Sequence, residues 1–172
     1  MLSSANKLKA AGAEFLICPD NTIHQAMMYV DGRSPLPWLH IAKVVADEAA
    51  RRGYRRLALT GTRWLVESGV YPEQLTERNI EYCRPNAAER AEISRIIMDE
   101  LTYGGDPPGA FKPQSIAYFQ QVIARLKDES ACDAVVLGCT EIPLIISDAN
   151  SPLPTLDSTR LLARAALKKA IG

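Results

Sequence analysis

The segment from Cys132 to Ile146 constrains the fold more than any other part of the chain. Its residues 134–137 are all apolar and include two adjacent valines, which is typical of a parallel strand buried on both faces. Gly138 ends this run and permits a sharp turn, so Cys139 and Thr140 follow at the carboxyl end of the strand. Open α/β sheets bind their ligands at this end of their strands. The segment therefore predicts both a parallel sheet and a binding site.

The same segment predicts a reactive thiol at Cys139. Glu141, Ile142 and Pro143 have the character of a first helical turn, in which proline needs no N–H donor. The positive end of a helix lowers the pKa of a nearby thiol and favours the thiolate. A free cysteine is more often a small buried apolar residue, but Cys139 stands at a turn outside the apolar run. We therefore interpret Cys139 as a functional group.

A short apolar strand, a polar cluster and a helix follow one another at three places in the chain. The polar clusters lie at residues 18–22, 60–62 and 139–141. Strands that alternate with helices in this way predict an α/β fold, with parallel sheets covered by helices.

Composition and charge exclude several classes of function. The chain has 172 residues, enough for one domain with a substantial core or for two small lobes. Its 20 basic and 20 acidic residues balance, and no basic block offers a nucleic-acid footprint. No apolar stretch is long enough for a membrane-spanning helix. The four cysteines, at positions 18, 83, 132 and 139, predict neither a zinc cluster nor disulfides, which indicates reduced thiols in the cytoplasm.

Polar side chains gather at all three predicted strand ends. Hydroxyls, an amide and main-chain N–H groups suit a carboxylate ligand. A thiolate among them can act as a base toward carbon or as a nucleophile. Threonine and asparagine are also common helix caps, so a purely structural interpretation of these side chains stays open. The residues concerned are Asp20, Asn21, Thr22, Thr60, Thr62, Cys139 and Thr140.

Three motifs resemble those of the aspartate/glutamate racemase family. Residues 138–144, GCTEIPL, resemble its C-terminal signature, and residues 21–24, NTIH, resemble the end of its N-terminal signature Cys-Asn-Thr-x-His. Residues 59–62, LTGT, resemble part of its central segment. The similarity covers nearly the whole chain from about residue 11 onward. Three motifs in the right order are far more specific than one.

The resemblance implies a cofactor-independent amino-acid racemase with two similar α/β lobes and an active site between them. In this family two residues, usually cysteines, face the α-carbon from opposite sides, and one removes a proton while the other returns one. Residues 1–50 would form an incomplete first lobe, completed by residues 151–172, and residues 51–150 the second lobe. The implied partners are an acidic or related amino acid as substrate and a second copy of the chain in a homodimer, with no membrane, nucleic acid, cofactor or metal.

The resemblance also assigns roles to residues of this chain. Cys139 would exchange a proton with the α-carbon. Glu141 would orient the substrate's amino group or simply cap the following turn. Main-chain N–H groups and hydroxyls would bind the substrate carboxylate, with these residues as candidates: Asn21, Thr22, Thr60, Thr62 and Thr140.

The position before Asn21 departs from the family pattern. Asp20 stands where the family carries a cysteine, and Cys18 lies two residues earlier. Asp20 is either the second catalytic base, since burial raises the pKa of a carboxyl group, or a helix cap, and we favour a role in the pocket. If Asp20 is only structural, Cys139 alone suits an isomerase or decarboxylase of a small dicarboxylic acid.

The start of the chain departs from the family pattern as well. Nothing in it resembles the strand and glycine-rich turn with which the family opens. This leaves three interpretations: a fragment, a mis-set start or a natively short protein. A protein without this unit could also be a catalytically inactive homologue that only binds an amino acid.

Two further side chains are secondary candidates. His24 either supports the turn at Thr22 or is a buried histidine bonded to the main chain, and we favour the second interpretation. Lys112 follows a loop rich in glycine and proline. It would either reach an acidic substrate side chain or stay solvated, which we favour.

Overall fold

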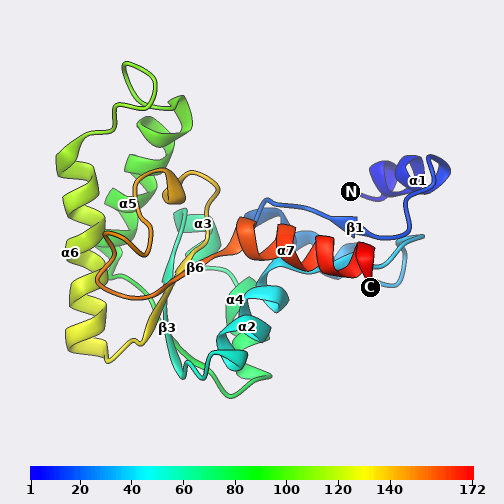
Figure 1. Cartoon of the computed structure of the whole chain (residues 1–172), viewed down its shortest axis with the longest axis horizontal. Coiled ribbons are helices and arrows are strands. Elements are labelled where there is room, and N and C mark those ends of the chain that lie inside the picture. The colour runs from blue at the N-terminus through cyan, green and yellow to red at the C-terminus, as the bar shows by residue number, and fades with distance from the viewer.

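The computed structural model describes all 172 residues, which form two parallel sheets surrounded by helices (Figure 1). The smaller sheet contains β1 (Leu16–Ile17) and β2 (Trp38–Leu39). The larger sheet has the strand order β4-β3-β5-β6, formed by Glu81–Cys83, Arg56–Thr60, Ala134–Leu137 and Thr155–Asp157. All pairings are parallel, which confirms the expected α/β fold.

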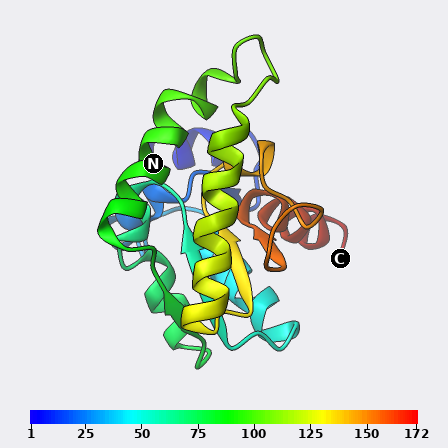
Figure 2. The same ribbon diagram turned by 90° about the vertical axis from the view of Figure 1, so that its left-hand side faces the viewer.

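Helices connect the strands and cover the larger sheet. The α-helices are α1 (Leu2–Ala10), α2 (Ile41–Arg51), α3 (Arg63–Val66), α4 (Val70–Thr76), α5 (Ala87–Asp99), α6 (Pro113–Ser130) and α7 (Ser158–Ile171). The 3₁₀ helices are η1 (Thr22–Tyr29), η2 (Leu101–Tyr103) and η3 (Ile142–Leu144). Figures 1 and 2 show α5 and α6 together on one side of the larger sheet. No helix in the structure combines the length and apolarity that crossing a bilayer requires.

Strand β5 is buried on both faces by two apolar cores. Val135 and Leu137 point into a core built with α5 and α6. Ala134 and Val136 point into a second core built with α2 and α4. Successive side chains of a strand point to opposite faces, so a strand covered on both sides needs an uninterrupted apolar run. This is the physical reason for the apolar run before Gly138.

The C-terminal segment contacts both sheets. Strand β6, within the residues 151–172 expected to complete the first lobe, pairs with β5 in the larger sheet. This pairing satisfies the backbone groups of β6 that face β5, and Leu156 is buried in the core beside α2. Only α7 returns to the smaller sheet, where it contacts β2 as well as α2. Helix α1 stands apart at the end of the molecule beside β1 (Figure 1).

Candidate active site

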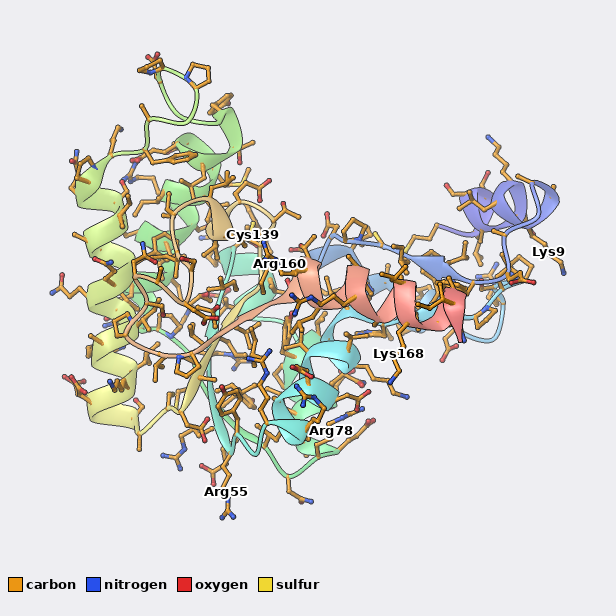
Figure 3. All side chains as sticks on the ribbon, in the orientation of Figure 1. Lys9, Arg55, Arg78, Cys139, Arg160 and Lys168 are labelled. Carbon is orange, nitrogen blue, oxygen red and sulfur yellow. The ribbon has the colours of Figure 1, made fainter.

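Three polar turns meet in one cavity at the carboxyl ends of β1, β3 and β5. They contribute residues 20–22, Thr62 and residues 138–141 to a cavity of about 290 Å³. This is close to the lower limit of roughly 300 Å³ for small-molecule sites. In Figure 3, Cys139 lies between the α5–α6 side of the molecule and the start of α7. The structure therefore brings together polar turns that are far apart in the sequence.

Gly138 allows the turns after β3 and β5 to approach each other. Its main-chain N–H donates to the Thr60 carbonyl oxygen across 2.9 Å. A Cβ atom at this position would lie only 2.6 Å from the same oxygen. Only glycine fits this approach without moving the strand end, so Gly138 sets the position of the neighbouring thiol.

The Cys139 thiol faces a carboxylate. Its Sγ donates to Glu141 Oε2 across 2.9 Å, and the Thr140 hydroxyl donates to the same oxygen across 2.6 Å. Burial and the bond to Glu141 raise the pKa of Cys139 to about 12, against the opposing effect of nearby main-chain N–H groups. Burial disfavours the charged form of Glu141, but the bonds from Cys139 and Thr140 outweigh this and lower its pKa. The resting pair is therefore a thiol and a carboxylate.

This protonation state differs from the lowered thiol pKa expected from the sequence. The expected helix after Cys139 is the single 3₁₀ turn η3, which has three residues. So short a helix supplies little positive charge at its first residues. Burial and the adjacent Glu141 carboxylate dominate instead, and both favour the neutral thiol.

Asp20 enters the same cavity from the end of the smaller sheet. Its Oδ1 accepts the Ile23 N–H across 3.0 Å at the start of η1, as a helix cap does. The second oxygen, Oδ2, makes no hydrogen bond within the protein and its residue is exposed. Capping and a role in the pocket are thus compatible in this geometry. Cys18, the other candidate for this role, does not line the cavity.

The Asn21 side chain joins the two sheets. It is buried, its Nδ2 donates to Ser158 Oγ across 3.0 Å, and its Oδ1 accepts the Tyr71 hydroxyl across 2.6 Å. Ser158 in turn donates to the Leu137 carbonyl oxygen at the end of β5 across 2.8 Å. The amide is thereby committed to the protein, which leaves only main-chain groups of Asn21 for a ligand. Sequence reasoning missed this network because its partners are 50 and 137 residues away.

The hydroxyls of Thr22 and Thr62 lie 3.4 Å apart and both residues line the cavity. Thr62 also accepts the Leu65 N–H as the cap of α3. The main-chain N–H groups of Asn21 and Thr22 donate to no acceptor within the protein. This corner of the cavity thus offers hydroxyl and N–H donors, the groups that bind a carboxylate.

Thr60 does not line the cavity, in contrast to the other predicted residues. Its side chain is buried and its hydroxyl donates to the Val136 carbonyl oxygen across 2.6 Å. Strand alternation places Thr60 on the same face as Ala58, which packs in the core built with α5 and α6. The expected substrate contact of Thr60 is therefore replaced by a bond that holds β3 to β5.

One wall of the cavity was not expected from the sequence. It consists of Ile97 and Met98 of α5 and Thr102 of η2. The apolar periodicity of α5 marks Ile97 as a core residue, and periodicity alone does not distinguish a core from a cavity wall. No group of three or more His, Cys, Asp or Glu residues is arranged to hold a metal ion.

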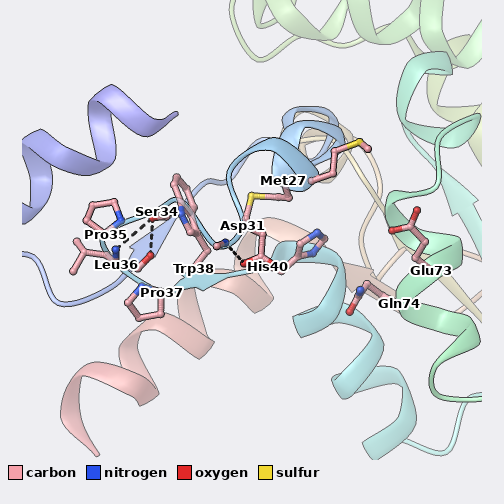
Figure 4. Close-up of a pocket in the computed structure, with 12 residues that line it drawn as sticks. Met27, Asp31, Ser34, Pro35, Leu36, Pro37, Trp38, His40, Glu73 and Gln74 are labelled. Atoms are coloured by element: carbon pink, nitrogen blue, oxygen red, sulfur yellow. Dashed lines mark hydrogen bonds between the residues drawn. The ribbon is translucent and has the colours of Figure 1, made fainter.

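A larger hollow of about 620 Å³ lies elsewhere, between the loop before β2 and helix α4. Figure 4 shows Trp38 and His40 on one side of it and Glu73 and Gln74 on the other. None of the site residues predicted from the sequence lines this hollow. The His40 ring lies 4.6 Å from that of His24, a cluster that the sequence did not indicate.

Comparison with known proteins identifies the family to which this chain belongs. The family model described as Asp/Glu/Hydantoin racemase matches residues 1–166. The chain belongs to this racemase family. The match confirms the resemblance drawn from the three motifs, and it makes the chain a member of an enzyme family whose named relatives are amino-acid racemases, which are isomerases.

Relatives within the racemase family share most of this chain. The broad specificity amino-acid racemase RacX of Bacillus subtilis is 22% identical over 167 residues, which cover 96% of this chain and 68% of RacX. The crystal structure of a protein described as an Asp/Glu racemase from Yersinia pestis is 32% identical, with a TM-score of 0.89. It is matched over 99% of this chain and 72% of its own. An aspartate racemase homologue from Pyrococcus horikoshii is 29% identical, with a TM-score of 0.88 over 99% of this chain and 73% of its own.

Proposed function

We propose that this chain racemises an amino acid by exchanging its α-proton between Asp20 and Cys139, without a cofactor. One relationship carries the proposal: two groups able to exchange protons enter one small cavity from different sheets. Membership of the racemase family supports the reaction class. A small pocket that positions an acid and a base on either side of one carbon is what proton exchange with inversion requires.

The substrate carboxylate would bind at the corner formed by Thr22 and Thr62. Their hydroxyls and the main-chain N–H groups of Asn21 and Thr22 are donors without an anionic partner in the protein. The same donors would stabilise the negative charge that spreads onto the carboxylate once the α-proton leaves. The weak acidity of that proton is the main barrier to the reaction. Fixed donors that stabilise the resulting negative charge would therefore contribute most to the rate.

The proton would then pass between two different groups. In one direction the Asp20 carboxylate removes the α-proton, and the Cys139 thiol gives its own proton to the opposite face. This leaves protonated Asp20 and a Cys139 thiolate, whose proton had been bonded to the Glu141 carboxylate across 2.9 Å at rest. In the other direction this thiolate removes the α-proton. Protonated Asp20 then completes that reaction. Glu141 would thus act on Cys139 and has no need to contact the α-carbon.

Deuterium incorporation tests the proposal. In heavy water the protein is expected to place deuterium at the α-carbon of its substrate while both enantiomers form. Cys139→Ala and Asp20→Asn should each slow racemisation by about 100-fold or more, the range for lost acid–base groups. Cys83→Ala, outside the cavity, is the matched control and should retain the rate. Racemisation by Cys139→Ala at the full rate would refute the proposal.

A second candidate function is a one-cysteine isomerase or decarboxylase acting on a small dicarboxylic acid. Two observations favour it: Cys139 is the single cysteine of the cavity, and Asp20 already caps η1 with one oxygen. Assays with maleate and with substituted malonates distinguish the two. This candidate requires that Asp20→Asn keep its activity on the diacid, and it is rejected if only amino acids react. Binding of an amino acid without turnover would instead indicate an inactive homologue.

The homodimer and the cytoplasmic location expected from the sequence stay predictions. Sedimentation of the purified chain tests the first, and fractionation of cells that express it tests the second.

A further inference from the structure

We propose that the site selects amino acids with an uncharged side chain and disfavours aspartate and glutamate. The inference rests on the proposed function, because it concerns the substrate of the same cavity. It narrows the substrate class expected from the sequence, which was an acidic or related amino acid. Three features of the cavity support it: the charges that line it, the partners of the cations around it and the chemistry of its α5–η2 wall.

No lysine, arginine or histidine lines the cavity. Its ionisable side chains are Asp20, Cys139 and Glu141, all of which are neutral or negative. In the proposed function, the hydroxyls of Thr22 and Thr62 donate hydrogen bonds to the α-carboxylate of the substrate. A second carboxylate on the side chain would meet no cation and would lie close to Asp20 or Glu141. Desolvating an unpaired charge beside like charges is strongly unfavourable.

Two cations close in sequence to the α5–η2 wall are engaged elsewhere. Glu100, between α5 and η2, accepts from Arg95 across 3.0 Å and from Lys112 across 3.4 Å. Lys112, which the sequence suggested as a ligand for an acidic side chain, lines a separate hollow with Glu100. The structure thus holds both cations away from the substrate cavity.

Two other arginines close in sequence to site residues also lie outside the cavity. Arg63 follows Thr62, but its guanidinium lies over the Trp64 ring, 5.6 Å from the ring centroid. Arg160 at the start of α7 lies 3.8 Å from Asp157 and lines a different hollow. An acidic side chain therefore finds no free basic partner among the residues that line its site.

The wall formed by α5 and η2 is apolar in its chemistry. Ile97 is buried and Met98 is 42% exposed, so both present hydrocarbon or thioether surface. The Thr102 hydroxyl donates to the Ile97 carbonyl oxygen across 2.8 Å. The hydroxyl is thus already bonded within the protein, and the rest of this side chain is an apolar methyl group. A wall of this kind binds an aliphatic or thioether side chain at low desolvation cost, and it disfavours a carboxylate more strongly than a neutral amide.

Isosteric substrate pairs test this inference because their members differ almost only in charge. We expect kcat/KM for racemisation to be at least 10-fold higher for asparagine than for aspartate, and for glutamine than for glutamate. Equal or higher kcat/KM for the acidic members would overturn the inference while leaving the racemase function in place.

A charge introduced into the wall provides the complementary test. Met98→Lys should shift the preference between glutamate and glutamine toward glutamate by at least 10-fold, whereas the matched variant Met98→Leu should leave this preference within about twofold. An unchanged preference in Met98→Lys would show that the side chain does not bind at this wall, which contradicts the inference.

Binding separates this inference from the proposed function. The Cys139→Ala protein is titrated with the same four amino acids by calorimetry, so no turnover is needed. Tighter binding of asparagine and glutamine supports the inference even if the chain racemises nothing. Tighter binding of the acidic members, or no binding of any of the four, overturns it.

Discussion

The thiol of Cys139 donates to the carboxylate of Glu141 across 2.9 Å within a single turn. The pair keeps the sulfur protonated, since burial and the Glu141 bond raise the pKa of Cys139 to about 12. Above its pKa a thiol reacts rapidly with alkylating agents, and below it slowly. Carboxamidomethylation of Cys139, followed by mass spectrometry, should therefore be slow at neutral pH and rise only above about pH 10.

Glu141→Gln should move this pH profile toward lower pH, because it removes the charge that opposes the thiolate. Burial, the larger cause of the raised pKa, remains in the variant, so Cys139 should still titrate above its ordinary value. A profile that is unchanged in Glu141→Gln would mean that the carboxylate does not act on the sulfur.

Replacing Asn21 by alanine should destabilise the protein by about 1–3 kcal/mol, the cost of leaving buried polar partners unsatisfied. The Tyr71 hydroxyl and Ser158 Oγ would each lose a partner. Denaturant unfolding gives the free energy. Asn6→Ala is the matched control, since Asn6 is exposed on α1, and it should change stability by less than about 0.5 kcal/mol. Equal effects of the two substitutions would contradict the bridging role of Asn21.

His40→Asn should reduce the dependence of stability on acid. Burial, then the nearby His24 and Lys43, lower the pKa of His40 to about 4, against the opposing charge of Asp31. The unfolded state therefore binds the proton more readily, and stability is lost as pH falls below about 6.5. Allowing for partial exposure, we expect a loss of about 1 kcal/mol between pH 7 and pH 5 from this group.

Asparagine is a suitable replacement because His40 caps α2 with its ring nitrogen, and asparagine is also a good cap. The variant should fold as before but show a smaller change in unfolding free energy between the two pH values. The pKa of His24 is also lowered, mainly by burial, so part of the acid sensitivity should remain. An identical pH dependence in His40→Asn would disprove the assignment.

Gly138→Ala should cost about 2 kcal/mol or more of stability and most of the activity. Its Cβ would collide with the Thr60 carbonyl oxygen, which is backbone and cannot turn aside. The control is Gly69→Ala, whose Cβ would meet only the end of the flexible Glu73 side chain. Thermal unfolding of both variants checks the difference. A Gly138→Ala protein as stable as Gly69→Ala would show that the two strand ends can separate freely.

Sequence patterns predicted the parts of this fold that depend on local or periodic signals. The apolar run of β5 predicted a strand buried on both faces. Asn86 carries a local signal of the same kind, since it caps α5 and forms a capping box with Glu89. The turns at Asp20, Thr62 and Cys139 were expected in one pocket because each follows the carboxyl end of a predicted strand, where open α/β sheets bind their ligands. These signals lie within a few residues of the feature that they predict.

The remaining features depend on contacts between distant segments. Strand β2 has only two residues and lies beside prolines, and it is a strand because it pairs with β1. The direction of the Thr60 hydroxyl depends on the register between β3 and β5. The pKa of Cys139 depends on burial, which a linear sequence does not reveal.

Ser158 connects helix α7 to two segments that line or border the candidate active site. It is the first residue of α7, and its hydroxyl is bonded both to Asn21 and to the last carbonyl of β5. Because one hydroxyl holds both segments, a movement of α7 would act on both Asn21 and the end of β5. A displacement of α7 would therefore change the width of the cavity between Asn21 and the turn after β5.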